Sequence, residues 1–180
     1  MLTQSLQYTD AAFASLAYDA ASCNDRRELV LLDDECTAVK LPSEIRQASR
    51  KLGMRLMKLF QPLCNSAMTD HYNEAVQTKQ AMGHYCIAFG LYAQALAIPK
   101  ADALTGFYYN AAAGMVTNSV KLVPLGQQDG QELLFALQPL IQQLTVNTMQ
   151  PDRALTGLCC AAFDIRCMQH EQLYSRLYMS

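Results

Sequence analysis

The chain has 180 residues, of which 51% are apolar and only 17% are charged, and its net charge is −2. This length suits about one domain, and the composition excludes intrinsic disorder, which requires low hydrophobicity and high net charge. The near-balanced charge also argues against a nucleic-acid binder that relies on an overall basic field. Because an average soluble domain is about 25% charged, we expect part of this surface to be apolar and to serve as an interface.

The seven cysteines are an odd number and include no CxxC pair. The amino terminus, MLTQSLQYTD, has neither the basic start nor the apolar run of a secretory signal. Both features favour a reducing compartment, in which cysteines act as small apolar residues with unreactive thiols. We therefore expect a cytoplasmic protein.

Two helices are predicted in the first third of the chain. The first has an apolar stripe at helical spacing, formed by Phe13, Leu16, Ala17, Ala20 and Ala21. Residues 24–41 are charged and irregular, so they predict a connection with at most one short helix. The second helix begins at Pro42-Ser43-Glu44 with Ser43 as its N-cap and ends at Pro62.

The second helix has an apolar side and a basic side. Its predicted core side consists of Ile45, Ala48, Leu52, Leu56 and Leu59. Its basic side consists of Arg46, Arg50, Lys51, Arg55 and Lys58. Such a basic face is more often an ordinary solvated surface than a contact with an acidic partner, and the spacing leaves both interpretations open.

The middle of the chain is almost uncharged. Between Gln80 and Gln128 the only charged residues are Lys100, Asp102 and Lys121, and residues 81–98 contain none. A helix of this kind is either buried or spans a membrane. The run is barely long enough to span, and it is interrupted by Gly83, His84, Gly90 and Gln94. We therefore predict a buried central helix, on which Gly83 and Gly90 let a neighbouring helix approach closely.

Helical spacing continues to the carboxy terminus. One helix has Leu104, Phe107, Tyr108, Ala111 and Met115 on one face and must kink or end at Pro124. Another follows with Leu134, Leu137, Ile141 and Leu144 and ends by Pro151, and a last helical pattern comes after it. With no repeat and no glycine-rich linker, we predict an all-α, single-domain helical bundle with an apolar central helix. We divide it into a helical domain, 1–167, and a partner-binding tail, 168–180.

Motifs for catalysis are absent from the sequence. It contains no GxxxxGK[ST], GxGxxG, GxSxG or HExxH. Cys160, Cys167 and His170 form a C-x6-C-x2-H pattern, and thiolates with imidazole suit zinc or nickel. The alternative function is therefore a stand-alone metal-binding helical protein. Because a second ligand pair is missing, we favour core cysteines and a solvated histidine, with no catalytic residue and no resident metal.

Two further features predict contact with partners. Lys121 is the only cation between Asp102 and Arg153, so it must snorkel, pair with Asp129 or Glu132, or face a partner. The ending is unusually apolar for a chain terminus and includes Leu173, Tyr174, Leu177, Tyr178 and Met179 around Arg176. Arginine and tyrosine dominate interface hot spots, so we favour docking of this tail on a partner over docking on its own domain.

Four segments together resemble the urease accessory protein F family. The most specific are SVKLVPLGQQDGQ (119–131) and MQHEQLYSRLYMS (168–180). PSEIRQASRKLG (42–53) and GHYCIAFGLYAQALAIP (83–99) are similar to helices of that family in the same order. The family also has a preceding segment with a PIG-x-[FY]-S-x-S-x-G-like motif, and no such motif precedes Met1-Leu2. The resemblance therefore predicts a shortened amino terminus and apolar surface that the missing segment would cover.

The resemblance implies a non-catalytic co-chaperone or scaffold for GTP-dependent incorporation of nickel into the urease active site. Members are all-helical homodimers that bind an accessory protein of the D or H type. Together the two recruit a nickel-carrying GTPase of the G type and act on apo-urease. It implies no tightly bound cofactor, since nickel is handled by the complex, and neither nucleic acid nor membrane as a partner.

The resemblance also assigns residues to partner binding. Tyr109 and Lys121 are similar to residues on the GTPase-facing surface, and Arg176 to an arginine needed to recruit the GTPase. The tail from Met168 is similar to a segment that becomes ordered on the D/H-type partner, which implies contacts from His170, Tyr174, Leu177 and Tyr178.

Overall fold

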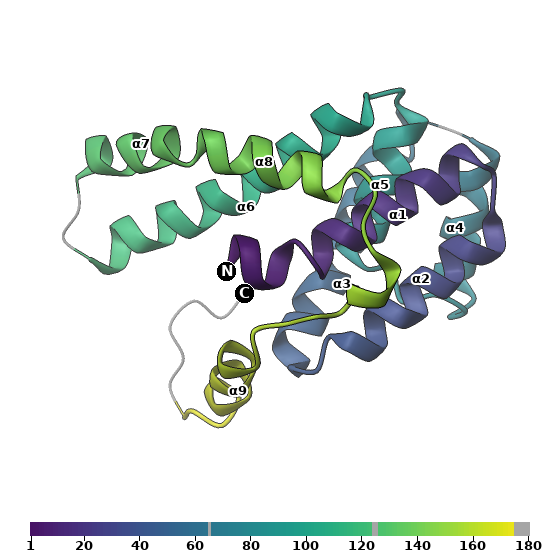
Figure 1. Cartoon of the computed structure of the whole chain (residues 1–180). Helices are drawn as coiled ribbons and strands as arrows, with labels where there is room; N and C mark the ends of the chain where they lie inside the picture. Colours follow the sequence, from purple (N-terminus) through teal and green to yellow (C-terminus); the bar gives the residue numbers. More distant parts are fainter. Residues whose placement is uncertain (65, 124–125, 175–180) are drawn as a thin grey trace.

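The structure is a computed structural model that describes residues 1–64, 66–123 and 126–174. These residues form helices with no strand among them, so the predicted all-α single domain is confirmed (Figure 1). In chain order the elements are η1 (Leu2–Leu6), α1 (Asp10–Ser22), α2 (Arg26–Val39), α3 (Ser43–Phe60), α4 (Ala67–Gln77), α5 (Tyr85–Ala95), α6 (Lys100–Leu122), α7 (Gln127–Ala136), α8 (Gln138–Thr148), η2 (Arg153–Leu155) and α9 (Ala161–His170).

Helices α1 and α5 pack against each other at the centre of the bundle (Figure 1). The predicted stripe on α1 is confirmed, because Phe13 and Ala17 are buried and Leu16 packs against the core. The apolar central helix is confirmed as α5, but it is shorter than residues 81–98. It begins only after Gly83 (φ 77°) and ends before Ala97 (φ 56°), since a positive φ interrupts a right-handed helix. No helix in the described ranges is long and apolar enough to cross a membrane.

The connection predicted over residues 24–41 is wrong, because α2 occupies most of it. The Asp25 side chain caps this helix by accepting a hydrogen bond of 2.9 Å from the Glu28 amide. Leu29, Leu32, Asp33 and Cys36 are buried on one side of α2, at helical spacing. The charge cluster concealed this period, since Asp33 points inward and its neighbour Asp34 points outward.

The second predicted helix is confirmed as α3, but its start and its inward face differ from the prediction. Pro42, with extended backbone, is the N-cap, and Ser43 is the first helical residue. The buried residues are Ser49, Gly53 and Met57, whereas Leu52 and Leu59 are exposed. The inward face of α3 is set by Gly53, which packs directly against the backbone at Gly83. A side chain at position 53 would collide with the Gly83 carbonyl oxygen.

The second half of α6 and all of α7 extend beyond the other helices as an arm (residues 109–123 and 126–136; Figure 1). Helix α6 ends at Leu122, ahead of Pro124, as predicted. Leu104, Phe107 and Tyr108 are buried, but Met115 is exposed because it lies on the arm. The predicted period continues from α7 into α8 through buried Leu134, Ile141 and Leu144, and α8 ends before Pro151.

An extended segment leads from α8 to α9 and contacts α2 and the residues just before α1. Arg153 donates hydrogen bonds to Glu28 (2.6 Å) and Glu35 (2.8 Å) of α2, and the Gly157 amide donates to the Tyr8 carbonyl oxygen (2.8 Å). Helix α9 has no buried residue and packs against α3. Met168, where the predicted tail begins, lies inside α9.

Candidate functional site

A shallow pocket of about 470 Å³ lies between α6 and α7 and includes Tyr109. Phe135 on α7 forms part of its wall and is 81% exposed, and Tyr109 is 44% exposed. The remaining lining residues are Gln128, Gln131, Glu132, Leu134 and Gln138. Aromatic rings surrounded mainly by glutamine side chains are typical of protein interfaces, because the rings bury a large area at a low entropic cost.

Sequence reasoning missed Phe135, although its position contained a usable signal. The stripe formed by Leu134, Leu137 and Ile141 fixes the inward face of α7 and α8. Phe135 follows Leu134 directly, and successive residues of a helix point about 100° apart, so its ring lies off that stripe, on the exposed side of the helix. An aromatic side chain at such a position is a candidate contact residue.

Lys121 lies in the last turn of α6, about 18 Å along the helix axis from Tyr109. Its side chain is exposed, and it forms no ion pair with any described residue. Asp129 instead accepts a hydrogen bond from the Gly126 amide (2.7 Å), and Glu132 accepts one from Gln128 (3.2 Å). Lys121 therefore does not pair with Asp129 or Glu132 in the structure. The other two alternatives, snorkelling and contact with a partner, remain.

The residues predicted for the tail lie in another region, at the end of α9. His170 is half-buried, and its Nδ1 atom lies 2.8 Å from Glu44 Oε2 of α3. Tyr174 is fully exposed. Arg176, Leu177 and Tyr178 lie outside the described residues. The structure thus separates the predicted contacts into two groups, Tyr109 with Lys121 on α6 and His170 with Tyr174 at the α9 end.

The alternative metal site does not form. Cys160 precedes α9, and no group of three metal-ligating side chains assembles anywhere in the described part of the chain. His170 is engaged with Glu44 rather than with Cys167. Burial, together with the nearby Asp164 carboxylate, raises the pKa of the Cys167 thiol and disfavours the thiolate that metal binding needs.

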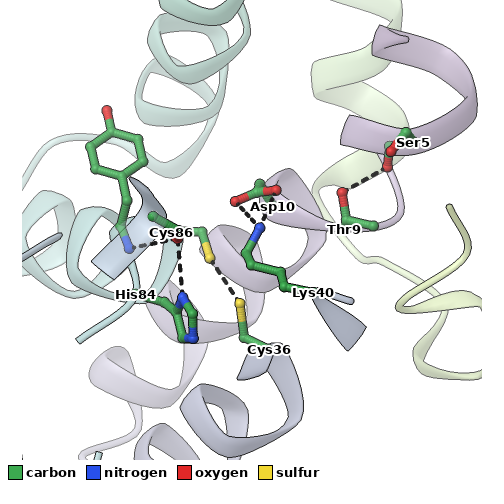
Figure 2. A network of polar contacts seen from close by, with 9 residues as sticks. Ser5, Thr9, Asp10, Cys36, Lys40, His84 and Cys86 are labelled. Atoms are coloured by element: carbon green, nitrogen blue, oxygen red, sulfur yellow. Dashed lines mark hydrogen bonds and ion pairs between the residues drawn. The ribbon is translucent and has the colours of Figure 1, made fainter. Parts of the chain in front are cut away.

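A network of buried polar groups joins α1, α2, α3 and α5 (Figure 2). Lys40 Nζ lies 2.7 and 2.8 Å from the two carboxylate oxygens of Asp10. Burial by itself lowers the pKa of Lys40, but the charge and hydrogen bond of Asp10, together with smaller contributions from Cys86 and Cys36, raise the pKa above its ordinary value. Nearby, the Sγ atoms of Cys36 and Cys86 are 3.5 Å apart, and burial raises the pKa of the Cys86 thiol. These groups satisfy one another, which is typical of a structural network.

His84 connects α3 and α2 within this network. Its Nδ1 atom lies 3.1 Å from Ser49 Oγ, and its Nε2 atom lies 2.9 Å from Thr37 Oγ1. The imidazole is fully buried. Burial lowers its pKa to about 4, although the nearby Asp33 carboxylate acts in the opposite direction. The folded protein therefore holds a neutral His84.

We expect stability to decrease on acidification because of His84. An unfolded histidine has a pKa of about 6.5, so between about pH 6.5 and pH 4 the unfolded state binds a proton that folded His84 does not. The free energy of unfolding should decrease through this window by at most roughly 3 kcal/mol. Urea titrations at several pH values measure it. A His84→Gln variant should lack this part of the slope, and His71→Gln should retain it; equal slopes in the two variants would contradict the assignment.

The fold and its exposed surfaces define a class: an all-α protein with apolar and aromatic surface suited to binding other polypeptides. The UreF family model matches residues 1–138. The chain is 48% identical to urease accessory protein UreF of Actinobacillus pleuropneumoniae over 99% of its own length and 79% of that protein. It is 44% identical to the UreF of Haemophilus influenzae (strain PittGG), covering 99% and 76%, and 35% identical to that of Sporosarcina pasteurii, covering 99% and 89%.

The chain therefore belongs to the UreF family of urease accessory proteins. The resemblance identified from four short segments is confirmed over nearly the whole chain. Family membership implies interaction with other urease accessory proteins.

Proposed function

We propose that this protein is a non-catalytic scaffold in the GTP-dependent incorporation of nickel into urease. It acts in the cytoplasm as a homodimer, binds an accessory protein of the D or H type, and with it recruits the nickel-carrying GTPase to apo-urease. Nickel is cargo of this complex and is not held tightly by the chain.

The observation that carries this proposal is the exposed Tyr109–Phe135 surface in a chain of the UreF family. Exposed aromatic rings cost free energy in water and are retained where a partner covers them. Lys121, exposed and free of carboxylate partners in the described chain, supplies a cation at the end of the same helix. The arm that bears these residues projects from the bundle and offers access without rearrangement of the core (Figure 1).

The second contact region is the α9 end. His170 is held by Glu44, while Tyr174 has its ring in solvent. A fixed helix end followed by an exposed aromatic residue suits a segment that anchors on a partner. We assign this region to the D/H-type protein, and Arg176 to recruitment of the GTPase.

We expect Lys121→Ala and Arg176→Ala to reduce recovery of the GTPase by about tenfold or more while the fold is unchanged, since an interface arginine or lysine contributes about 1.4 kcal/mol or more. The experiment is a pull-down with purified D/H-type and G-type proteins, with circular dichroism as the check of folding. Arg27→Ala removes an exposed cation at the start of α2 and serves as the matched control. Undiminished recovery with both variants would contradict the proposed mechanism.

A further inference from the structure

The outer face of α3 is positively charged. Between Glu44 and Asp70 the sequence has five cations and no acidic residue, in a chain whose net charge is −2. Arg55 and Lys58 on this face are exposed, and neither forms an ion pair with the described residues. The charge asymmetry is thus local to this helix.

Exposed leucines lie among these cations. Leu52 is 54% exposed and Leu59 is 59% exposed, and their spacing of seven residues places them on one line along α3. Arg55 lies between them, one turn from each. This face therefore presents an apolar row bordered by positive charge. Because α3 is oriented with Gly53 facing the core, these leucines lie on the surface.

A groove of about 880 Å³ adjoins this apolar row. Ala48 and Leu52 of α3, Tyr85 of α5 and Cys167 of α9 are among its lining residues. The lining also includes the carboxylates Glu44 and Glu171 and the cations Lys51 and Arg166. The pair formed by His170 and Glu44 fixes α9 to α3 beside the groove. Because Leu52 belongs to both the row and the groove, the two form one continuous surface.

We propose that this surface, the outer face of α3 with the α3–α9 groove, binds an acidic amphipathic helix of a partner polypeptide. Charge complementarity requires acidic side chains opposite Arg55 and Lys58, and the leucine row requires an apolar stripe beside them. Nucleic acid would leave Leu52 and Leu59 without apolar contacts. A flat anionic bilayer would not fill a groove that lies between two helices. This inference concerns a different face from the Tyr109–Phe135 surface and goes beyond the proposed function.

The test measures binding of the full chain to a fluorescein-labelled peptide of about five helical turns, with leucines on one face and glutamates on the other. Fluorescence anisotropy should show saturable binding that weakens with added salt. A peptide with lysine in place of every glutamate should not bind. Arg55→Glu with Lys58→Glu should weaken binding by about tenfold or more, since each change replaces attraction by repulsion.

Two variants make the result specific. Leu52→Asp removes the shared apolar contact and should weaken binding with little effect on folding, because that side chain is exposed. Arg26→Glu with Arg27→Glu reverses two exposed cations on α2 and should leave binding unchanged. Failure of the acidic peptide to bind, or equal affinity in the α3 and α2 double variants, would overturn the proposal. The proposal would also be overturned if the protein bound phosphatidylserine–phosphatidylcholine vesicles in a charge-dependent way but did not bind the acidic peptide.

Discussion

Replacement of Gly90 by alanine is expected to destabilise the bundle by at least about 3 kcal/mol, because the new methyl group has no space. Gly90 lies on α5 where that helix meets α1. An added Cβ atom would collide with the Ala14 carbonyl oxygen and lie 3.0 Å from the Tyr18 amide nitrogen. Both are backbone atoms of α1, so a rotamer change cannot relieve the collision, and the two central helices must separate. Urea unfolding followed by circular dichroism measures the loss.

The matched control is the same substitution at Gly106 on α6, where an added Cβ atom meets nothing within 4 Å. Glycine in a helix interior is less favourable than alanine by about 1 kcal/mol, so Gly106→Ala should be neutral or stabilising. The two substitutions should therefore change the free energy of unfolding in opposite directions. This difference separates the effect of helix propensity from the effect of close backbone packing. A Gly90→Ala protein as stable as Gly106→Ala would show that α1 and α5 do not approach as closely as described.

The contact between α1 and α5 at Gly90 illustrates why most of the fold was predictable from the sequence. Helices α1, α5, α6 and α8 bury apolar stripes, and such stripes are visible as local periodicity. Glycine near the middle of an uncharged helix indicated close approach of a neighbour, and Gly90 has that role. Local pattern was sufficient wherever the buried side of a helix is apolar.

Prediction failed where the buried side of a helix is polar or has no side chain. On α2 the inward position of Asp33 looked like part of a charged connection, because its partners are distant in the sequence. On α3 the inward residues include Ser49 and Gly53, so the leucines suggested the wrong face. In each case the deciding contact involves residues 30 or more positions away, and no local window contains it.

The Tyr109–Phe135 surface was partly predictable from the sequence, whereas the groove between α3 and α9 was not. Lys121 is distinctive in the sequence as an isolated cation, but the partner contacts proposed for Lys121 and Tyr109 rest on the family resemblance. The helical period of α7 also places Phe135 outside the core stripe, so its exposure follows from local pattern. The groove beside α3 requires α9 to lie against α3, which depends on the pair of His170 with Glu44, 126 residues apart.

Asp33→Ala is expected to reduce the free energy of unfolding by about 3–5 kcal/mol, because two buried donors and one partly buried donor lose their acceptor. Asp33 is fully buried, and its Oδ1 atom accepts hydrogen bonds from the Tyr72 hydroxyl (2.6 Å) and the His84 amide (3.0 Å). Its Oδ2 atom accepts one from the Met82 amide. Burial and the Asp33 charge together raise the pKa of Tyr72 well above its ordinary value, so this hydroxyl remains a donor at every physiological pH.

The position of these donors makes the carboxylate central to the fold. Tyr72 comes from α4, and Met82 and His84 belong to the turn that leads into α5, so Asp33 of α2 fixes the entry of the central helix. Asp34→Ala, at the exposed neighbouring position, should change stability by no more than about 0.5 kcal/mol. Asp33→Asn should give an intermediate loss, since the amide keeps one acceptor oxygen but directs an N–H group at a donor. If Asp33→Ala unfolds at the same urea concentration as Asp34→Ala, the buried carboxylate does not hold α2, α4 and the α5 entry together.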